Sequence, residues 1–282
     1  KEGTDYTADQ GWFDSDKIRF RQGRPEKIGG WEKFTTNFFL GVSRSLHRWA
    51  SLSFTKYIGV GTHLKFYIAE GNNFNDVTPI RLTTSAGDPR FAATNGSSII
   101  TVTEAGHGAV VNDFISFTSA ATLGGTIVAS VLNQEHQIVS VSSSSVYTFI
   151  AKDTSGNIVT ANGSDSGNGG SSTVGKYQIN TGLNAYVSST GFGASAWGSG
   201  GFGSASDISS ANQLRLYSQD NFGEDLVLNV RGGGIYYHDT SVGLATRAVD
   251  ISAISGQSNA PTIALQVMVS DIDQHVIAFG VN

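Results

Sequence analysis

Hydrophobic residues in this chain alternate with polar ones or occur in short runs bounded by Gly, Ser, Asn and Asp. Alternation with a period of two is typical of a half-buried β-strand, whereas a helix repeats its apolar positions every three to four residues. The stretch with the best helical pattern, residues 260–269, also favours a strand. Many short strands at regular spacing predict an all-β fold. The clearest strand patterns are residues 57–60, 64–68, 98–103, 114–117, 137–141 and 146–150.

An internal repeat organises these strands. Residues 57–68 and 226–238 share the order strand, Gly turn, strand, and a third copy begins at Val276. Neighbouring units of this kind bury each other's faces in a β-propeller. We therefore expect a partial β-propeller-like body, with the first blade strands in residues 34–81 and a return to blades in residues 182–282. Two and a fraction blades do not close a ring, so we expect the chain to be cut at both ends, or the hairpins to belong to another assembly.

Residues 82–181 have a different character, with few charges and many Ser, Gly and Thr residues. About seven short strands in about a hundred residues is the size of an immunoglobulin-like β-sandwich. We expect an inserted domain that folds independently and whose ends lie close together, because it interrupts a repeat. Residues 161–172 contain nothing to bury and predict an exposed loop. Residues 191–203, which include Trp197 and Phe202, mark the return to the body.

The first 33 residues combine charge, aromatic side chains and turn residues. Within residues 16–21, cations alternate with apolar side chains, which predicts a strand with one cationic face. A turn at residues 22–26 and a second short strand follow. The apolar area exceeds what a short segment leaves in water, so we expect an assembly arm packed on another subunit or an adaptor. The residues assigned to this interface are Trp12, Phe13, Lys17, Ile18, Arg19, Phe20, Arg21, Arg24, Ile28 and Trp31.

On residues alone, the cationic face of the arm is suited to a protein, a nucleic-acid backbone or plain water. Two groups of residues then add a resemblance to a family of tailed-bacteriophage virion structural proteins. The first is Lys1-Glu-Gly-Thr-Asp-Tyr6 with Gly11-Trp12 and residues 16–31, and the second is residues 215–226 with 231–239. The resemblance spans nearly the whole chain.

This resemblance implies a tail nozzle, tail tubular or hub-like protein that is built around a β-propeller and located in the virion tail. The implied partners are copies of the chain in a ring, for which we expect a hexamer, and tail adaptor and tail fibre or spike proteins. Genomic DNA would pass through transiently. The family brings no catalytic residues with it.

Composition narrows the possible chemistry. The chain of 282 residues has no cysteine, which excludes disulfides and thiolate metal sites. Its formal charge of −5 argues against a surface built throughout to hold DNA. The six His residues lack metal-ligand spacing, and no Gly-x-Ser-x-Gly motif occurs. No apolar run is long enough to predict a membrane span. We therefore expect no cofactor, no metal site and no catalytic residue.

Three functions remain. The leading hypothesis is a structural subunit of a phage tail machine that joins the tail to the portal-proximal complex, forms part of the DNA exit path and is not an enzyme. The alternatives are a receptor- or glycan-binding tail module, and a polysaccharide-degrading tail enzyme, for which the sequence offers only scattered acids. Since cation contacts with phosphates add affinity through counterion release, we expect a neutral or acidic channel surface and arm cations that meet carboxylates of a neighbouring protein.

Overall fold

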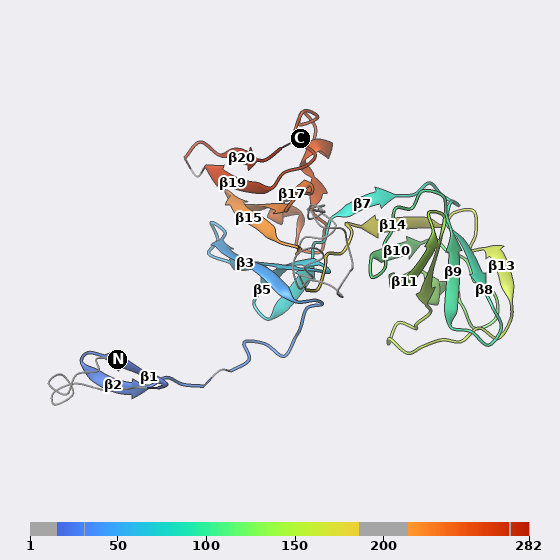
Figure 1. The fold of residues 1–282 in the computed structure, drawn as a ribbon, viewed down its shortest axis with the longest axis horizontal. Helices are drawn as coiled ribbons and strands as arrows, with labels where there is room; N and C mark the ends of the chain where they lie inside the picture. Colours follow the sequence, from blue (N-terminus) through green and yellow to red (C-terminus); the bar gives the residue numbers. More distant parts are fainter. Residues whose placement is uncertain (1–15, 31, 186–213, 271, 282) are drawn as a thin grey trace, which may run out of the picture. The chain divides into compact units, whose positions relative to one another are not determined.

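The structure is a computed structural model that describes residues 16–30, 32–185, 214–270 and 272–281. The chain divides into two units, residues 1–36 and residues 37–282. The described residues form β-strands, one four-residue α-helix, α2 (Ala129–Leu132), and two 3-10 helices, η2 (Thr240–Val242) and η3 (Ile251–Ala253) (Figure 1). The predicted all-β fold is therefore confirmed. Among these residues, no helix has the length and hydropathy needed to cross a membrane.

The first unit contains a hairpin of β1 (Ile18–Arg21) and β2 (Arg24–Lys27). Gln22 and Gly23 both have positive φ angles, 52° and 78°. Two consecutive residues in this conformation form a type I′ turn, whose twist matches that of the strands. The turn is shorter than the predicted 22–26, because Arg24 and Pro25 already pair with β1.

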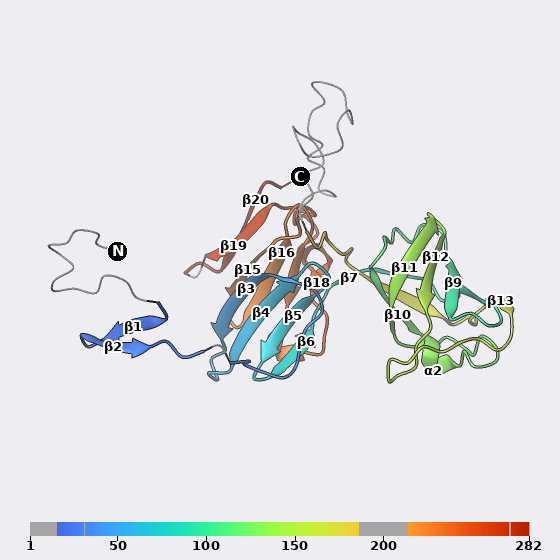
Figure 2. The ribbon, with the colours of Figure 1, turned by 60° about the horizontal axis from the view of Figure 1, so that its bottom comes forward.

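Two four-stranded antiparallel meanders and a hairpin form the body of the second unit. Each meander has the strand number of a propeller blade, and Figure 2 shows the strands of the first meander side by side. Val276, where the third copy of the repeat was expected, lies in the second strand of the hairpin. The closed propeller itself stays a prediction. The first meander is β3 (Ser43–Ala50), β4 (Lys56–Thr62), β5 (Phe66–Glu70) and β6 (Asn73–Asp76); the second is β15 (Tyr217–Phe222), β16 (Asp225–Val230), β17 (Ile235–His238) and β18 (Val249–Asp250); the hairpin is β19 (Gln266–Ser270) and β20 (His275–Phe279).

β16 is covered on both faces. Because side chains alternate across a strand, Leu226 and Leu228 enter a core shared with the first meander, and Val227 enters a core shared with the hairpin. All three are completely buried. The first core also contains Trp49, Phe66, Ile68 and Tyr236, and the second contains Ile235, Val267 and Val269.

Two glycines in β4 let the first and second meanders approach closely. Gly59 lies against the Gln219 side chain, and Gly61 lies against Tyr217 of β15. A Cβ atom at position 61 would stand 2.5 Å from Tyr217 Cδ2, closer than side chains tolerate. The Gly-x-Gly pattern of β4 thus permits the packing of β15 on its face.

Residues between the two meanders form one eight-stranded antiparallel sheet in the order β13-β8-β9-β12-β11-β10-β14-β7. Phe91 of β8 and Phe117 of β10 have ring centroids 4.8 Å apart although three strands separate β8 from β10 in the sheet order. The sheet therefore folds over a single core. That residues 82–181 have the immunoglobulin-like topology stays a prediction. That this domain folds independently also stays a prediction. The strands are β7 (Ile80–Thr83), β8 (Arg90–Ala93), β9 (Ile99–Thr103), β10 (Phe114–Thr118), β11 (Glu135–Ser143), β12 (Val146–Ile150), β13 (Asp165–Asn168) and β14 (Val174–Gln178).

We refer to residues 80–178 as the insert. Its first and last strands pair, with Leu82 opposite Tyr177, so its ends lie close together as expected. The prediction that residues 161–172 form a loop with nothing to bury is wrong. Ala161 is buried in the core, and β13 pairs with β8. The second Gly-rich passage, residues 191–203, lies outside the described residues.

We expect Gly61→Ala to destabilise the body by about 1–3 kcal/mol, because the added methyl group overpacks the contact between β4 and Tyr217 of β15. Chemical denaturation measures the change. Gly163→Ala is the matched control, since nothing lies within 4 Å of a Cβ atom there and its φ angle is not positive. Equal stability of the two variants would contradict close packing between β4 and β15.

Candidate functional site: the hairpin and a groove between three strands

Seven of the ten residues predicted to form the assembly interface are described, and all seven lie on or beside the hairpin β1–β2. Lys17 has a φ angle of 56°, so the extended strand begins only at Ile18. The predicted row of three cations on one strand is therefore wrong, and β1 supplies Arg19 and Arg21 only. The seven residues are Lys17, Ile18, Arg19, Phe20, Arg21, Arg24 and Ile28, whereas Trp12, Phe13 and Trp31 lie outside the described residues.

β2 restores a row of three guanidinium groups, because Arg24 stands directly opposite Arg21. Like charges directly opposite each other across two strands are destabilising. The same face carries one carboxylate, Glu26, whose Oε2 atom lies 3.2 Å from Arg19 Nε. Both members of that pair are exposed, so the contact contributes at most about 1 kcal/mol.

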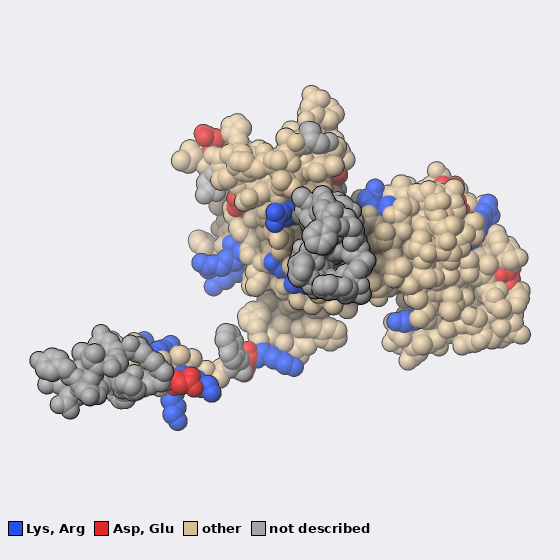
Figure 3. Space-filling view, in the orientation of Figure 1, with Lys and Arg blue, Asp and Glu red and all other residues tan. Residues whose placement is uncertain are grey.

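Residues 16–30 contain five basic and two acidic side chains, although the chain as a whole is acidic. Figure 3 shows these charges on the hairpin β1–β2 and a body surface that is mostly uncharged in that view. Apolar side chains accompany them, since Phe20 is 50% and Ile28 54% exposed. The hairpin β1–β2 thus combines a surplus of positive charge with exposed apolar area.

A groove of about 400 Å³ lies between β3, β15 and β19, the first strands of the two meanders and of the hairpin β19–β20. It is a mixed polar and apolar surface with one formal charge, the carboxylate of Asp220. No Lys or Arg is among the described residues that line it. Those residues are Ser45, Leu46, His47, Tyr217, Ser218, Gln219, Asp220, Gln266, Val267 and Met268.

Side chains of β15 hold β19 at this groove. Val267 N donates to Ser218 Oγ, and Val269 N donates to Asp220 Oδ2, each at 2.9 Å. Alternate backbone N–H groups of β19 therefore bond to alternate side chains of β15. This arrangement attaches the hairpin β19–β20 to the second meander through directional contacts.

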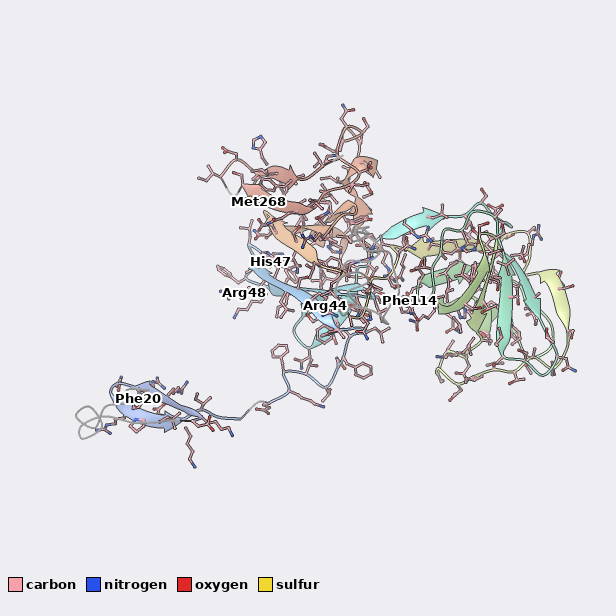
Figure 4. All side chains as sticks on the ribbon, in the orientation of Figure 1. Phe20, Arg44, His47, Arg48, Phe114 and Met268 are labelled. Carbon is pink, nitrogen blue, oxygen red and sulfur yellow. The ribbon has the colours of Figure 1, made fainter. Side chains whose placement is uncertain are left out.

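Two polar atoms that lack a hydrogen-bond partner among the described residues, and two arginines, also lie at or near the groove. His47 Nε2 and Gln219 Oε1 are buried and have no hydrogen-bond partner among the described residues. Figure 4 shows His47 and Met268 at the groove, with Arg44 and Arg48 on the same strand as His47. Arg44 donates to the Asn184 carbonyl, and Arg48 is exposed. The cations of β3 thus flank the groove without lining it.

The insert holds a buried polar network. Tyr177 donates to Glu104 at 2.7 Å, and its hydroxyl oxygen lies 2.8 Å from that of Tyr147. Burial raises the pKa of Glu104 and lowers the pKa of His107, whose ring packs against Tyr147. These groups are buried and none of them lines the groove between β3, β15 and β19, so we assign them a structural role. The described ranges contain no group of three or more side chains able to ligate a metal ion.

Sequence reasoning missed the role of Ser218 and Asp220 in holding β19, because a hydrogen bond from a side chain to a distant strand leaves no local pattern. It also missed four charged residues at the junction of body and insert, Lys65, Asp76, Glu135 and Arg247. One signal was available for Lys65, which interrupts an otherwise apolar strand pattern at residues 64–68.

No family model matches the sequence. No curated protein matches it either. Among solved structures, the chain is similar to phage phi92 endosialidase with a TM-score of 0.27 and 12% sequence identity, over 88% of this chain and 35% of that chain. The chain therefore spans about a third of the length of that structure. A TM-score this low does not establish a common fold.

We expect Asp220→Ala to speed the exchange of the Val269 amide hydrogen by more than about tenfold, because a hydrogen bond to a charged group contributes about 1.5–3 kcal/mol. Native-state hydrogen exchange measures this effect. Asp273→Ala, in the turn between β19 and β20, is the control and should leave that amide protected. Unchanged protection in Asp220→Ala would mean that the carboxylate does not hold the strand.

Proposed function

We propose that this chain is a structural subunit of a phage tail machine, a nozzle or hub ring that connects the tail to the portal-proximal complex. In this proposal it is not an enzyme, and it resides in the virion tail. Its partners are further copies of itself in a ring, for which we propose six, together with a tail adaptor and tail fibre or spike proteins.

The observation that carries the proposal is the hairpin β1–β2, formed by residues of the first of the two groups that carry the family resemblance. An isolated two-stranded hairpin is marginally stable in water. This hairpin also sets Arg21 opposite Arg24 and exposes Ile28. Such a segment gains stability from a partner that supplies carboxylates to the cationic face and apolar area to the other face.

We also propose that the ring forms part of the DNA exit path, and the lining of the groove between β3, β15 and β19 is an example of a surface that suits this role. Affinity for DNA depends on Lys and Arg contacts with phosphates. The groove has none among its lining residues and carries the carboxylate of Asp220. A DNA-facing surface of this composition would not retain a polyanion through phosphate contacts.

We expect neutralisation of the arm, Arg19→Gln with Arg21→Gln and Arg24→Gln, to reduce incorporation of the chain into phage particles. We expect the chain to bind DNA weakly, and the same substitutions to leave that binding unchanged. Incorporation is measured by quantifying the chain in purified particles, and DNA affinity by a salt titration. The matched control neutralises three exposed cations of the insert, Arg90, Lys152 and Lys176.

Three results would contradict the proposal. Normal incorporation of the arm variant would remove the assembly role. Tight, salt-dependent DNA binding that the arm variant abolishes would make the hairpin a DNA-contacting element. Specific binding on a glycan array, without incorporation into the tail ring, would favour the receptor-binding alternative.

A further inference from the structure

Four charged side chains close a ring of ion pairs between the body and the insert. Lys65 Nζ lies 2.6 Å from Asp76 Oδ2 and 2.5 Å from Glu135 Oε1. Arg247 completes the ring, with Nη1 2.5 Å from Asp76 Oδ1 and Nη2 3.4 Å from Glu135 Oε2. Each carboxylate therefore faces both cations. Asp76 ends β6 of the first meander, Arg247 precedes β18 of the second, and Glu135 begins β11 of the insert.

The ring is shielded from water at its centre. The Lys65 side chain is 3% exposed, and its ammonium group lies 4.4 Å from the ring centroid of Phe114 in β10. Phe114 is labelled on the insert in Figure 4. A cation over an aromatic ring in a dry environment is attracted more strongly than one in water. The insert thus contributes both a carboxylate and an aromatic face to a lysine of the body.

Further contacts fix the two carboxylates. Asp76 accepts hydrogen bonds from the Thr78 hydroxyl at 2.6 Å and the Thr78 amide at 3.0 Å, and Glu135 accepts one from Gln178. Burial raises the pKa of Asp76, but Lys65 and Arg247 together outweigh burial, so the pKa lies below its ordinary value. Asp76 is therefore ionised at neutral pH.

The chain itself connects body and insert only through two crossing segments. These segments pair beside each other, with Ile179 N donating to Pro79 O at 3.0 Å. Two adjacent crossings leave a hinge axis between the parts they join. The ring lies next to that axis, since Thr78 of the first crossing segment and Gln178, the last residue of the insert, contact its carboxylates.

We propose that this ring of ion pairs locks the insert in one orientation on the body, so that the insert is a rigid projection and not a tethered domain. All ion pairs between body and insert in the described part of the chain belong to the ring. Removal of one member leaves an uncompensated charge in a partly buried site, which the structure relieves by opening the junction to water.

The absence of cysteine makes the lock directly measurable. Lys56→Cys on β4 and Ser144→Cys in the turn between β11 and β12 place two spin labels at exposed positions, one on the body and one on the insert. Pulsed electron spin resonance then gives the distribution of distances between the labels. We expect one narrow distribution in the otherwise unchanged chain.

Glu135→Gln keeps the shape of the side chain and removes its charge, and we expect it to broaden the distribution at least twofold. Lys65→Met should broaden it further, and Lys176→Gln, an exposed lysine of the insert, is the matched control that should leave it narrow. Circular dichroism establishes that each variant is folded, and Glu135→Gln decides the test if Lys65→Met does not fold. A broad distribution in the parent chain, or one as narrow in Glu135→Gln as in the parent, would overturn the proposal.

Discussion

The body of this protein depends on one sheet, the second meander, that is apolar on both faces and therefore has to be covered twice. Leu226 and Leu228 of β16 need the first meander on one side, and Val227 needs the hairpin β19–β20 on the other. Hydrophobic burial is non-directional, so it favours stacking without fixing how the sheets stack. The glycines of β4 then decide how closely β15 approaches.

Directional contacts set the register that burial leaves open. The Trp49 indole donates to the Glu224 carbonyl at 2.8 Å, and the hydrogen bonds of Ser218 and Asp220 hold β19. Asn229 is completely buried, and its amide group lies within 3.2 Å of carbonyl oxygens in the β16–β17 turn and of Ala264. These contacts join the first meander to the second and the second meander to the hairpin β19–β20, so the groove between β3, β15 and β19 has a defined shape.

The period of two was sufficient to predict the all-β fold, because it depends only on neighbours in sequence, and the internal repeat could be found by comparing two segments of the chain. The hairpin β1–β2 was also predictable, whereas the left-handed conformation of Lys17 was not, since its φ angle depends on where pairing with β2 ends. β13 reads Asp-Ser-Gly-Asn and has no apolar pattern; it is a strand because it pairs with β8. The ring of ion pairs was equally invisible, because Lys65 and Glu135 are 70 residues apart in sequence.

An insertion between two repeats is tolerated here because the body holds both ends of it. Val77 and Ile179, which flank the insert, belong to the core shared by the two meanders. Val77 O also accepts a hydrogen bond from Ala248 N at 3.0 Å, next to Arg247 of the ring. A force on the insert would therefore act on the ring and on the contact between the meanders together. The same few residues that make the insertion compatible with the body also couple the position of the insert to the packing of the sheets that form the groove.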